Sequence, residues 1–288
     1  MTLSLGILLA LACALASNVG FLYKHRGVCA APAVDMRRPW WTARQLFGSR
    51  LFAIGWGVAT GAWLFHVAAL AIAPLSVVQA VLAGGVVMLA VMAERMFGVR
   101  IGRRQWIGLY LTAGGLVLLG LTLPVIHGAH SRFSVPGMIS LEGGLIAAGT
   151  LLIMGPRIGA PREHHGFMLG AAAGILFGVS DIAIKALSGM IGAHGLLGLL
   201  SPWLLVTVAA SVAAFYASAK SLQDGQAVPV IAVTGTAANL AGIVGGITVF
   251  GDPLSANPLG LVIECFAFLF VLAAAWLMPA PVRAVAVA

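Results

Sequence analysis

The stretch GVSDIAIKAL, residues 178–187, places Asp181 and Lys185 inside an otherwise apolar run. Their four-residue spacing puts both side chains on one face of a helix, where a carboxylate and an ammonium can form an ion pair. A carboxylate buried without such a partner binds a proton more readily, as a proton-exchanging residue must. Three interpretations are therefore open: a solute or proton site, a structural ion pair, and a position at a membrane interface.

The composition of the chain makes these two charges unusual. Of the 288 residues, 61% are hydrophobic and only 8% are charged, whereas soluble domains carry about 25% charged residues. With so few charges the chain cannot cover itself with a water-facing surface, so most of its surface must face lipid. The cysteines Cys13, Cys29 and Cys265 are too few and too scattered for a disulfide framework or a metal site.

Nine segments of the sequence are long and apolar enough to cross a bilayer, which requires roughly 20 mainly apolar residues. Prolines lie between several of them, because proline ends one helix and begins the next. The sequence therefore predicts an all-α polytopic membrane protein. The predicted spans are 2–24, 50–73, 75–94, 105–123, 136–155, 166–189, 203–222, 227–249 and 257–278.

The basic residues predict the orientation of these spans. No basic side chain precedes the first apolar run, which favours an uncleaved helix with its N-terminus outside over a signal peptide. With the N-terminus outside and the C-terminus inside, every lysine and arginine except Arg132 and Lys185 falls on the inner side, as the basic excess of cytoplasmic loops requires. The formal charge of +8 then reports topology and not nucleic-acid binding. Lys24 is expected to extend to the cytoplasmic surface.

Two parts of the chain resemble each other and predict an inverted repeat. NVGFLYK (18–24) parallels VSDIAIK (179–185), and FHVAALAIAPLSVVQA (65–80) parallels FYASAKSLQDGQAVPV (215–230). Equivalent helices lie five spans apart, so the two halves run through the membrane in opposite senses. Inverted repeats are typical of transporters that bind solute near the midplane between the halves. The predicted divisions are a first repeat (1–123), a linking fifth span with its loops (124–165) and a second repeat (166–288).

Several motifs resemble the drug/metabolite transporter superfamily: AIAPLSVVQAVLAG (71–84) and VMAERMFGVRIGRRQWIGLYLTAGGLVLLG (91–120). Within it, ASNVGFLYKHRG (16–27), the Trp40-Trp41 pair and IKAL (184–187) resemble the NIPA-type magnesium transporters. The resemblance implies nine spans and magnesium transport. Two positions depart from it, because Trp63 and His66 stand where the NIPA-type second helix has glutamate and asparagine. Magnesium prefers hard oxygen ligands, so the departure argues against magnesium here.

Polar residues at membrane depth are the candidates for binding or coupling. Interhelical hydrogen bonds and satisfied core positions explain several of them equally well. Whether any of them binds a metal stays unknown. Glu142 is a further buried carboxylate, on the linking span. The candidates are Asp181, Glu264, His66, Gln79, Asn239, Lys185 and Asn18.

These patterns predict a secondary transporter of a small cationic or zwitterionic solute, such as a divalent cation, amino acid, polyamine or quaternary ammonium, working by alternating access. Protons could couple through Asp181 or Glu264. The alternative is a non-transporting membrane scaffold, or an accessory subunit of a lipid-handling complex. No catalytic motif is present, so neither enzymatic activity nor a cofactor is expected. The partners are the lipid bilayer and the solute, with monomer and homodimer both open. The scarcity of lysine beside arginine favours a bacterial plasma (inner) membrane.

Overall fold

The computed structural model describes residues 2–35, 37–73, 75, 77–79, 81–82, 85, 92, 95, 102–122, 133–252, 255 and 257–277. Helices account for nearly all of these residues, and no strand occurs among them. The α-helices are α1 (Thr2–Cys29), α2 (Pro39–Gly48), α3 (Arg50–Ile72), α5 (Arg103–Thr122), α6 (Val135–Ile153), α7 (His165–His194), α8 (Pro202–Asp224), α9 (Ala227–Thr248) and α10 (Pro258–Leu277). Short 3-10 turns (Gly155–Arg157, Arg162–His164 and Gly195–Leu200) flank α7.

Six helices of the described part are long and apolar enough to cross a membrane, namely α1, α3, α6, α7, α8 and α9. The chain is therefore a multi-pass membrane protein, as its composition predicts. Helices α5 and α10 also begin and end within a few residues of the limits of the fourth and ninth predicted spans. Most of the third predicted span, 75–94, lies outside the described residues, so the count of nine stays a prediction.

The structure differs from the predicted spans at three places. Helix α1 continues past Lys24 to Cys29, and α7 continues past residue 189 to His194. The segment that the prediction leaves as a loop contains α2, which begins at Pro39, a residue suited to the first helical turn. Trp40, in the first turn of α2, is 88% exposed. An exposed tryptophan on a short helix at the end of the bundle suits the membrane–water interface.

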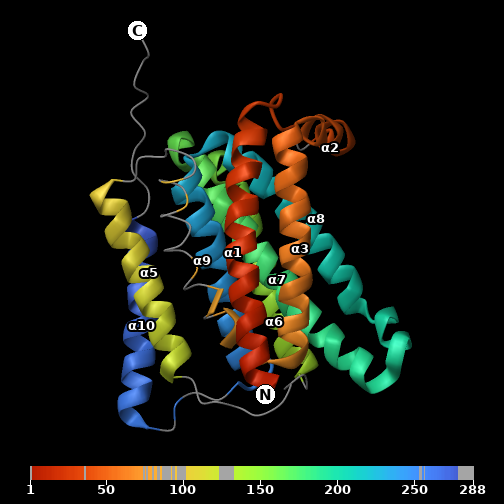
Figure 1. The fold of residues 1–288 in the computed structure, drawn as a ribbon, viewed down its shortest axis with the longest axis vertical. Coiled ribbons are helices and arrows are strands. Elements are labelled where there is room, and N and C mark those ends of the chain that lie inside the picture. The colour runs from red at the N-terminus through yellow and green to blue at the C-terminus, as the bar shows by residue number, and fades with distance from the viewer. Residues whose placement is uncertain are drawn as a thin grey trace.

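The helices form a bundle in which α7 is the central element (Figure 1). It packs against α6, α8 and α9, while α1 packs along α3 in front of it, and α5 pairs with α10 at one side. Sixteen of the thirty residues of α7 are buried, which explains its long apolar run. Helix α9 is buried on most sides as well, with buried residues from Ala227 to Gly246. The two helices together form the interior of the protein.

Glycines allow the closest helix contacts. On α1, a Cβ at Gly20 would lie 2.9 Å from the carbonyl oxygen of Gly55 on α3. On α7, a Cβ at Gly178 would overlap Ala241 of α9, and one at Gly174 would overlap the Thr234 carbonyl. The glycines at four-residue spacing in α7 thus form the surface that receives α9, which is the packing role that such spacing predicts.

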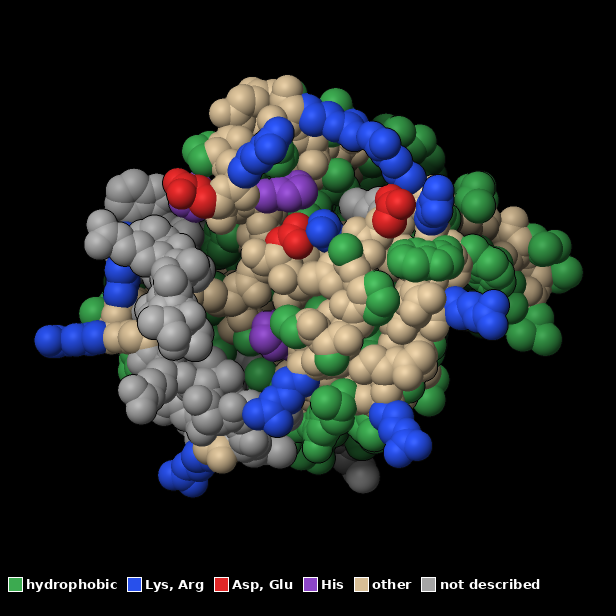
Figure 2. Space-filling model, turned by 90° about the horizontal axis from the view of Figure 1, so that it is seen from above, with side chains coloured by type: hydrophobic (Ala, Val, Ile, Leu, Met, Phe, Trp, Pro, Cys, Tyr) green, Lys and Arg blue, Asp and Glu red, His purple; other side chains and the backbone are tan. Residues whose placement is uncertain are grey.

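Basic side chains gather at the end of the bundle where α1 ends and where α3 and α5 begin. Figure 2, which views this end, shows lysine and arginine side chains around its rim. Arg26, Arg50 and Arg103 lie at these helix ends. These basic side chains therefore share one end of the bundle.

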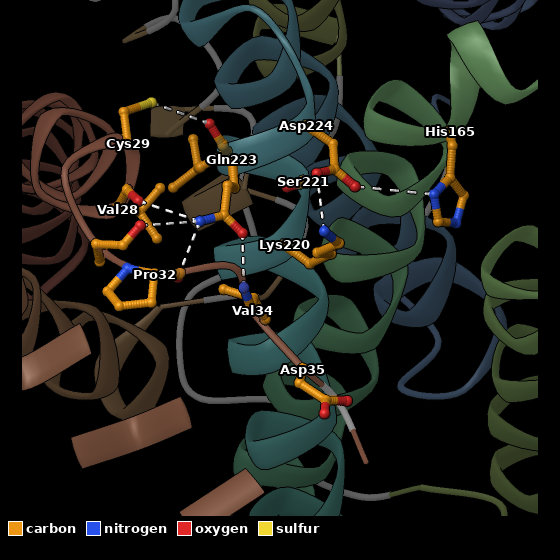
Figure 3. Close-up of polar contacts among 12 residues, drawn as sticks. Val28, Cys29, Pro32, Val34, Asp35, His165, Lys220, Ser221, Gln223 and Asp224 are labelled. Carbon is orange, nitrogen blue, oxygen red and sulfur yellow. Dashed lines mark hydrogen bonds and ion pairs between the residues drawn. The ribbon is translucent and has the colours of Figure 1, made fainter. Parts of the chain in front are cut away.

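At the same end, the segment that links α1 to α2 is fastened to α8 (Figure 3). The side-chain amide nitrogen of Gln223 donates to the carbonyls of Val28, Ala31 and Pro32 at 3.4, 3.4 and 3.1 Å. Its oxygen accepts from the Val34 backbone N–H at 2.7 Å. One glutamine on α8 therefore satisfies four backbone groups of a segment almost two hundred residues earlier in the sequence.

We expect Gly174→Ala to destabilise the α7–α9 interface, because the new methyl group would overlap a backbone carbonyl that cannot rotate away. Overpacking of this kind costs about 1–3 kcal/mol. The apparent unfolding temperature in detergent measures the effect. Gly143→Ala is the matched control, because nothing lies within 4 Å of a Cβ there. Equal unfolding temperatures for Gly174→Ala and the wild type would contradict the described packing.

Candidate functional site

Two adjoining, partly open cavities lie between the helices of the bundle. The first, here called the central cavity, has a volume of about 220 Å³ and is lined by residues of α1, α3, α7 and α9 and by Gln79 and Leu82. The second, here called the side cavity, has a volume of about 380 Å³ and is lined by α1, α3, α7 and α8. Lys24, Trp63, Phe177 and Asp181 line both. The two cavities thus meet at a shared wall that carries both an acidic and a basic side chain.

Asp181 is held in this wall by two side chains from other segments. Nε2 of His66 on α3 lies 2.9 Å from Oδ1 of Asp181. The side-chain amide of Gln79 donates to Oδ2, also at 2.9 Å. His66 and Gln79 are 6% and 1% exposed, so both donors reach the carboxylate away from bulk water. An ionised carboxylate offers about four acceptor positions, and the aspartate therefore keeps acceptor capacity for a further donor from a solute.

Local structure explains why these three groups meet. Asp181 lies close to the middle of α7, because that helix extends from His165 to His194. On α9, Gly242 leaves the space in which Gln79 lies, since a Cβ there would be 2.6 Å from Cγ of the glutamine. A larger residue at Gly242 would push Gln79 off the carboxylate. The site is thus close to the middle of the long central helix.

Lys185 does not pair with Asp181, although the helical spacing allows it. Its ammonium donates instead to the carbonyls of Leu70 and Ala73, at 2.8 and 2.9 Å. Those carbonyls belong to the C-terminal end of α3, where backbone acceptors lack partners within the helix and a cation is favoured. Lys185 is fully buried, and the Asp252 carboxylate adds a further attraction. The lysine therefore joins α7 to the end of α3.

Both predicted asparagines line the central cavity, and one of them also joins two segments of the chain. Asn239 of α9 and Asn18 of α1 both line the central cavity. Asn18 also donates to the Gly85 carbonyl at 2.8 Å. It therefore has the interhelical hydrogen bond that its structural interpretation predicts, and faces the cavity as well.

The two other buried carboxylates lie elsewhere. Glu264 of α10 accepts a hydrogen bond from the Ser255 backbone N–H at 3.1 Å, and Glu142 is buried on α6. Neither lines either cavity. Among the described residues the structure thus brings His66, Gln79, Asn239 and Asn18 together with Asp181, and leaves Glu264 and Lys185 apart from them.

The sequence interpretation missed residues that the cavities contain. Lys24, expected at the cytoplasmic surface, lines both cavities, and that expectation is wrong. Trp63, noted only as a departure from a family motif, also lines both. The side cavity adds Ser180 and Ser211, whose hydroxyl groups lie 2.8 Å apart. Serines on apolar helices gave no signal in the sequence, because their small polar groups disturb no periodicity.

The described residues contain no cluster of three histidine, cysteine, aspartate or glutamate side chains that could hold a metal ion. The arrangement is suited to non-covalent recognition. A carboxylate, three amides and a lysine ammonium line the central cavity between apolar helices. Groups of these kinds bind polar solutes through hydrogen bonds and charge.

We expect Lys185→Met to lower the stability of the fold by roughly 1–3 kcal/mol, because it leaves buried carbonyls at the end of α3 without their donor. Asp181→Asn should cost less, since asparagine keeps the shape and an acceptor oxygen for His66 or Gln79. Thermal unfolding in detergent compares the two variants. The assignment of Lys185 to the scaffold fails if its variant is the more stable of the pair.

The chain is 22% identical over 279 residues to a protein of Arabidopsis thaliana described as probable magnesium transporter NIPA9. The match covers 92% of this chain and 79% of the relative. No protein-family model and no solved structure match the chain. The similarity extends over nearly the whole sequence, so this multi-pass membrane protein is a distant relative of a protein described as a probable transporter of the NIPA type.

Proposed function

We propose that this chain is a secondary transporter of the drug/metabolite type that moves a small cationic or zwitterionic solute across a bacterial plasma membrane. The observation that carries the proposal is Asp181, which is held by His66 and Gln79 in the wall of an internal cavity. A charged residue inside a membrane bundle is costly to bury. A solute that needs the charge explains why it is present.

Alternating access in this proposal takes place between two inverted four-helix repeats, 1–123 and 166–288, joined by the segment with α6. The helix packing supports the division. Helix α1 packs on α3 as α7 packs on α8, and the contact of α1 with α8 has its counterpart in that of α7 with α3. If each helix of one repeat is replaced by its counterpart in the other, these contacts map onto each other.

The orientation proposed is N-terminus outside and C-terminus inside, with the basic rim of Figure 2 in the cytoplasm. On that side, the hydrogen bonds of Gln223 join the end of the first repeat's α1 to α8 of the second repeat. These are contacts that opening to the cytoplasm would have to rearrange. The hydrogen bonds of Gln223 are thus where the proposed motion would begin on the cytoplasmic side.

Magnesium is the substrate named for the Arabidopsis relative, and the cavities here offer little for it. Magnesium keeps tight octahedral oxygen coordination and loses water reluctantly. Asp181 is the one carboxylate among the described lining residues, and Trp63 contributes an indole without oxygen. An organic ammonium, which needs fewer and less regular acceptors, suits the cavity better. If transport is coupled to protons, we propose that Asp181 carries the proton. Glu264 instead accepts a hydrogen bond from the Ser255 backbone N–H and lies outside both cavities.

We expect purified protein in proteoliposomes to take up at least one probe from a panel of labelled putrescine, choline, amino acids and magnesium. Asp181→Asn should lower that uptake about tenfold or more, since loss of the charge removes an interaction worth at least ~1.4 kcal/mol. Initial uptake rates with and without a pH gradient provide the measurement.

Glu142→Gln is the matched control, because it also converts a buried carboxylate to an amide but lies outside both cavities. It should transport like the wild type. If no probe enters the vesicles, the alternative of a non-transporting scaffold gains support. If both variants transport normally, Asp181 is not part of the solute site.

A further inference from the structure

Lys24 directs its ammonium into the bundle and not toward the cytoplasm. The ammonium lies 3.8 Å from the centre of the Phe21 ring, one turn earlier on α1. Side chains on a helix tilt toward its N-terminus, which for α1 is the direction of the cavities. Both Lys24 and Phe21 line the central cavity. The lysine stem therefore extends from the end of α1 back toward the level of Asp181.

Lys24 and its counterpart in the repeat, Lys185, have different partners. Lys185 is engaged by two backbone carbonyls and is fully buried. No carboxylate of the described chain forms an ion pair with Lys24. A lysine that faces an internal cavity, with an aromatic ring as its neighbour, retains donors for an anionic group.

The charges of the cavity walls limit what can bind. Among the described lining residues, the side chains that carry charge near neutral pH are Lys24, His66 and Asp181. With His66 neutral the walls sum to zero, and with His66 protonated they sum to one positive charge. A divalent cation would add two uncompensated charges in a medium of low polarity, where burial of charge is costly. A zwitterion adds no net charge and offers one partner to each ion.

The register of α1 on α3 separates the two ions along the bundle and favours an extended solute. Gly6 of α1 packs on Ala73 of α3, and Gly20 packs on Ala59, so the helices run antiparallel and Cys13 lies level with His66. Lys24 follows Cys13 by eleven residues, about 16 Å of helix rise. The lysine stem, which points back along α1, spans part of that gap. The remainder exceeds the separation in an α-amino acid, whose ammonium and carboxylate share one carbon.

We propose that Lys24 binds the carboxylate of a zwitterionic solute whose amine lies at the far end of a carbon chain, next to Asp181. This inference rests on the proposed transport function and names its substrate class: an ω-amino acid or a similarly extended zwitterion. Phe21, Trp63 and Phe177, which line the central cavity together, supply apolar surface for the intervening methylene groups. The amine takes an open acceptor position of the carboxylate held by His66 and Gln79.

Calorimetric titration of the detergent-purified protein with matched six-carbon probes tests the proposal. The probes are ε-aminocaproate, its α-amino isomer norleucine, hexylamine, caproate and hexamethylenediamine. We expect ε-aminocaproate to bind the wild type roughly tenfold or more tightly than each of the others, since it alone satisfies both ions at their spacing.

Lys24→Gln should weaken binding of ε-aminocaproate by roughly tenfold or more and leave that of hexylamine unchanged. Lys24→Arg, which keeps the charge, should restore most of the affinity. Arg162→Gln removes an exposed positive charge outside both cavities and should bind every probe like the wild type. Retained hexylamine binding by Lys24→Gln shows that the variant is folded.

The failures are distinguishable. If the wild type binds and transports hexylamine or hexamethylenediamine in an Asp181-dependent way, but ε-aminocaproate no more tightly and with no effect of Lys24→Gln, this inference is wrong and the transport proposal stands. If norleucine equals ε-aminocaproate, the extended geometry is wrong. If the wild type neither binds nor takes up any probe, magnesium included, both proposals fall.

Discussion

The cost of keeping charge inside a lipid-facing bundle governs how this protein is built. With 8% charged residues, most charges lie outside the apolar spans, and two of those inside have specific partners from other segments. Asp181 has a histidine and a glutamine. Lys185 has the carbonyl end of a helix. In each case the partner groups lie on a segment other than the one that carries the charge. The buried charges therefore help to determine which helices pack together.

The packing of α7 follows from this constraint. The helix carries both Asp181 and Lys185, and its glycines bring α9 so close that backbone atoms touch backbone atoms. Gly242 of α9 then leaves room for Gln79 beside Asp181. Small residues therefore do two things here: they allow dense packing without a hydrophobic driving force between helices, and they leave the cavity in which polar groups meet.

Lys24 and Lys185, which end two similar stretches of sequence, have different roles in the structure. Lys185 satisfies backbone carbonyls and closes the end of α3, whereas Lys24 faces both cavities beside Phe21. The equivalent positions suggest equal roles, and the asymmetry between them leaves one charge of each sign in the cavity walls. A transporter that recognises a solute with two different ends needs such an asymmetry, because a site built from identical halves would present the same group twice.

The sequence by itself determined the class of the protein and the positions of most of its helices. Apolar runs bounded by prolines and arginines depend on local composition, so α3, α6, α8 and α9 begin and end within a few residues of the predicted limits. The same local reasoning named Asp181, His66, Gln79, Asn239 and Asn18, since polar residues are conspicuous in apolar spans. The partners were decided only by the tertiary structure. Asp181 and Lys185 are neighbours on one helix face, yet each bonds to a segment about one hundred residues away. The direction of Lys24 likewise depends on the cavity beside α1, which other helices create. Hydrogen-bond partners across helices are chosen by three-dimensional packing, and spacing along one chain cannot specify them.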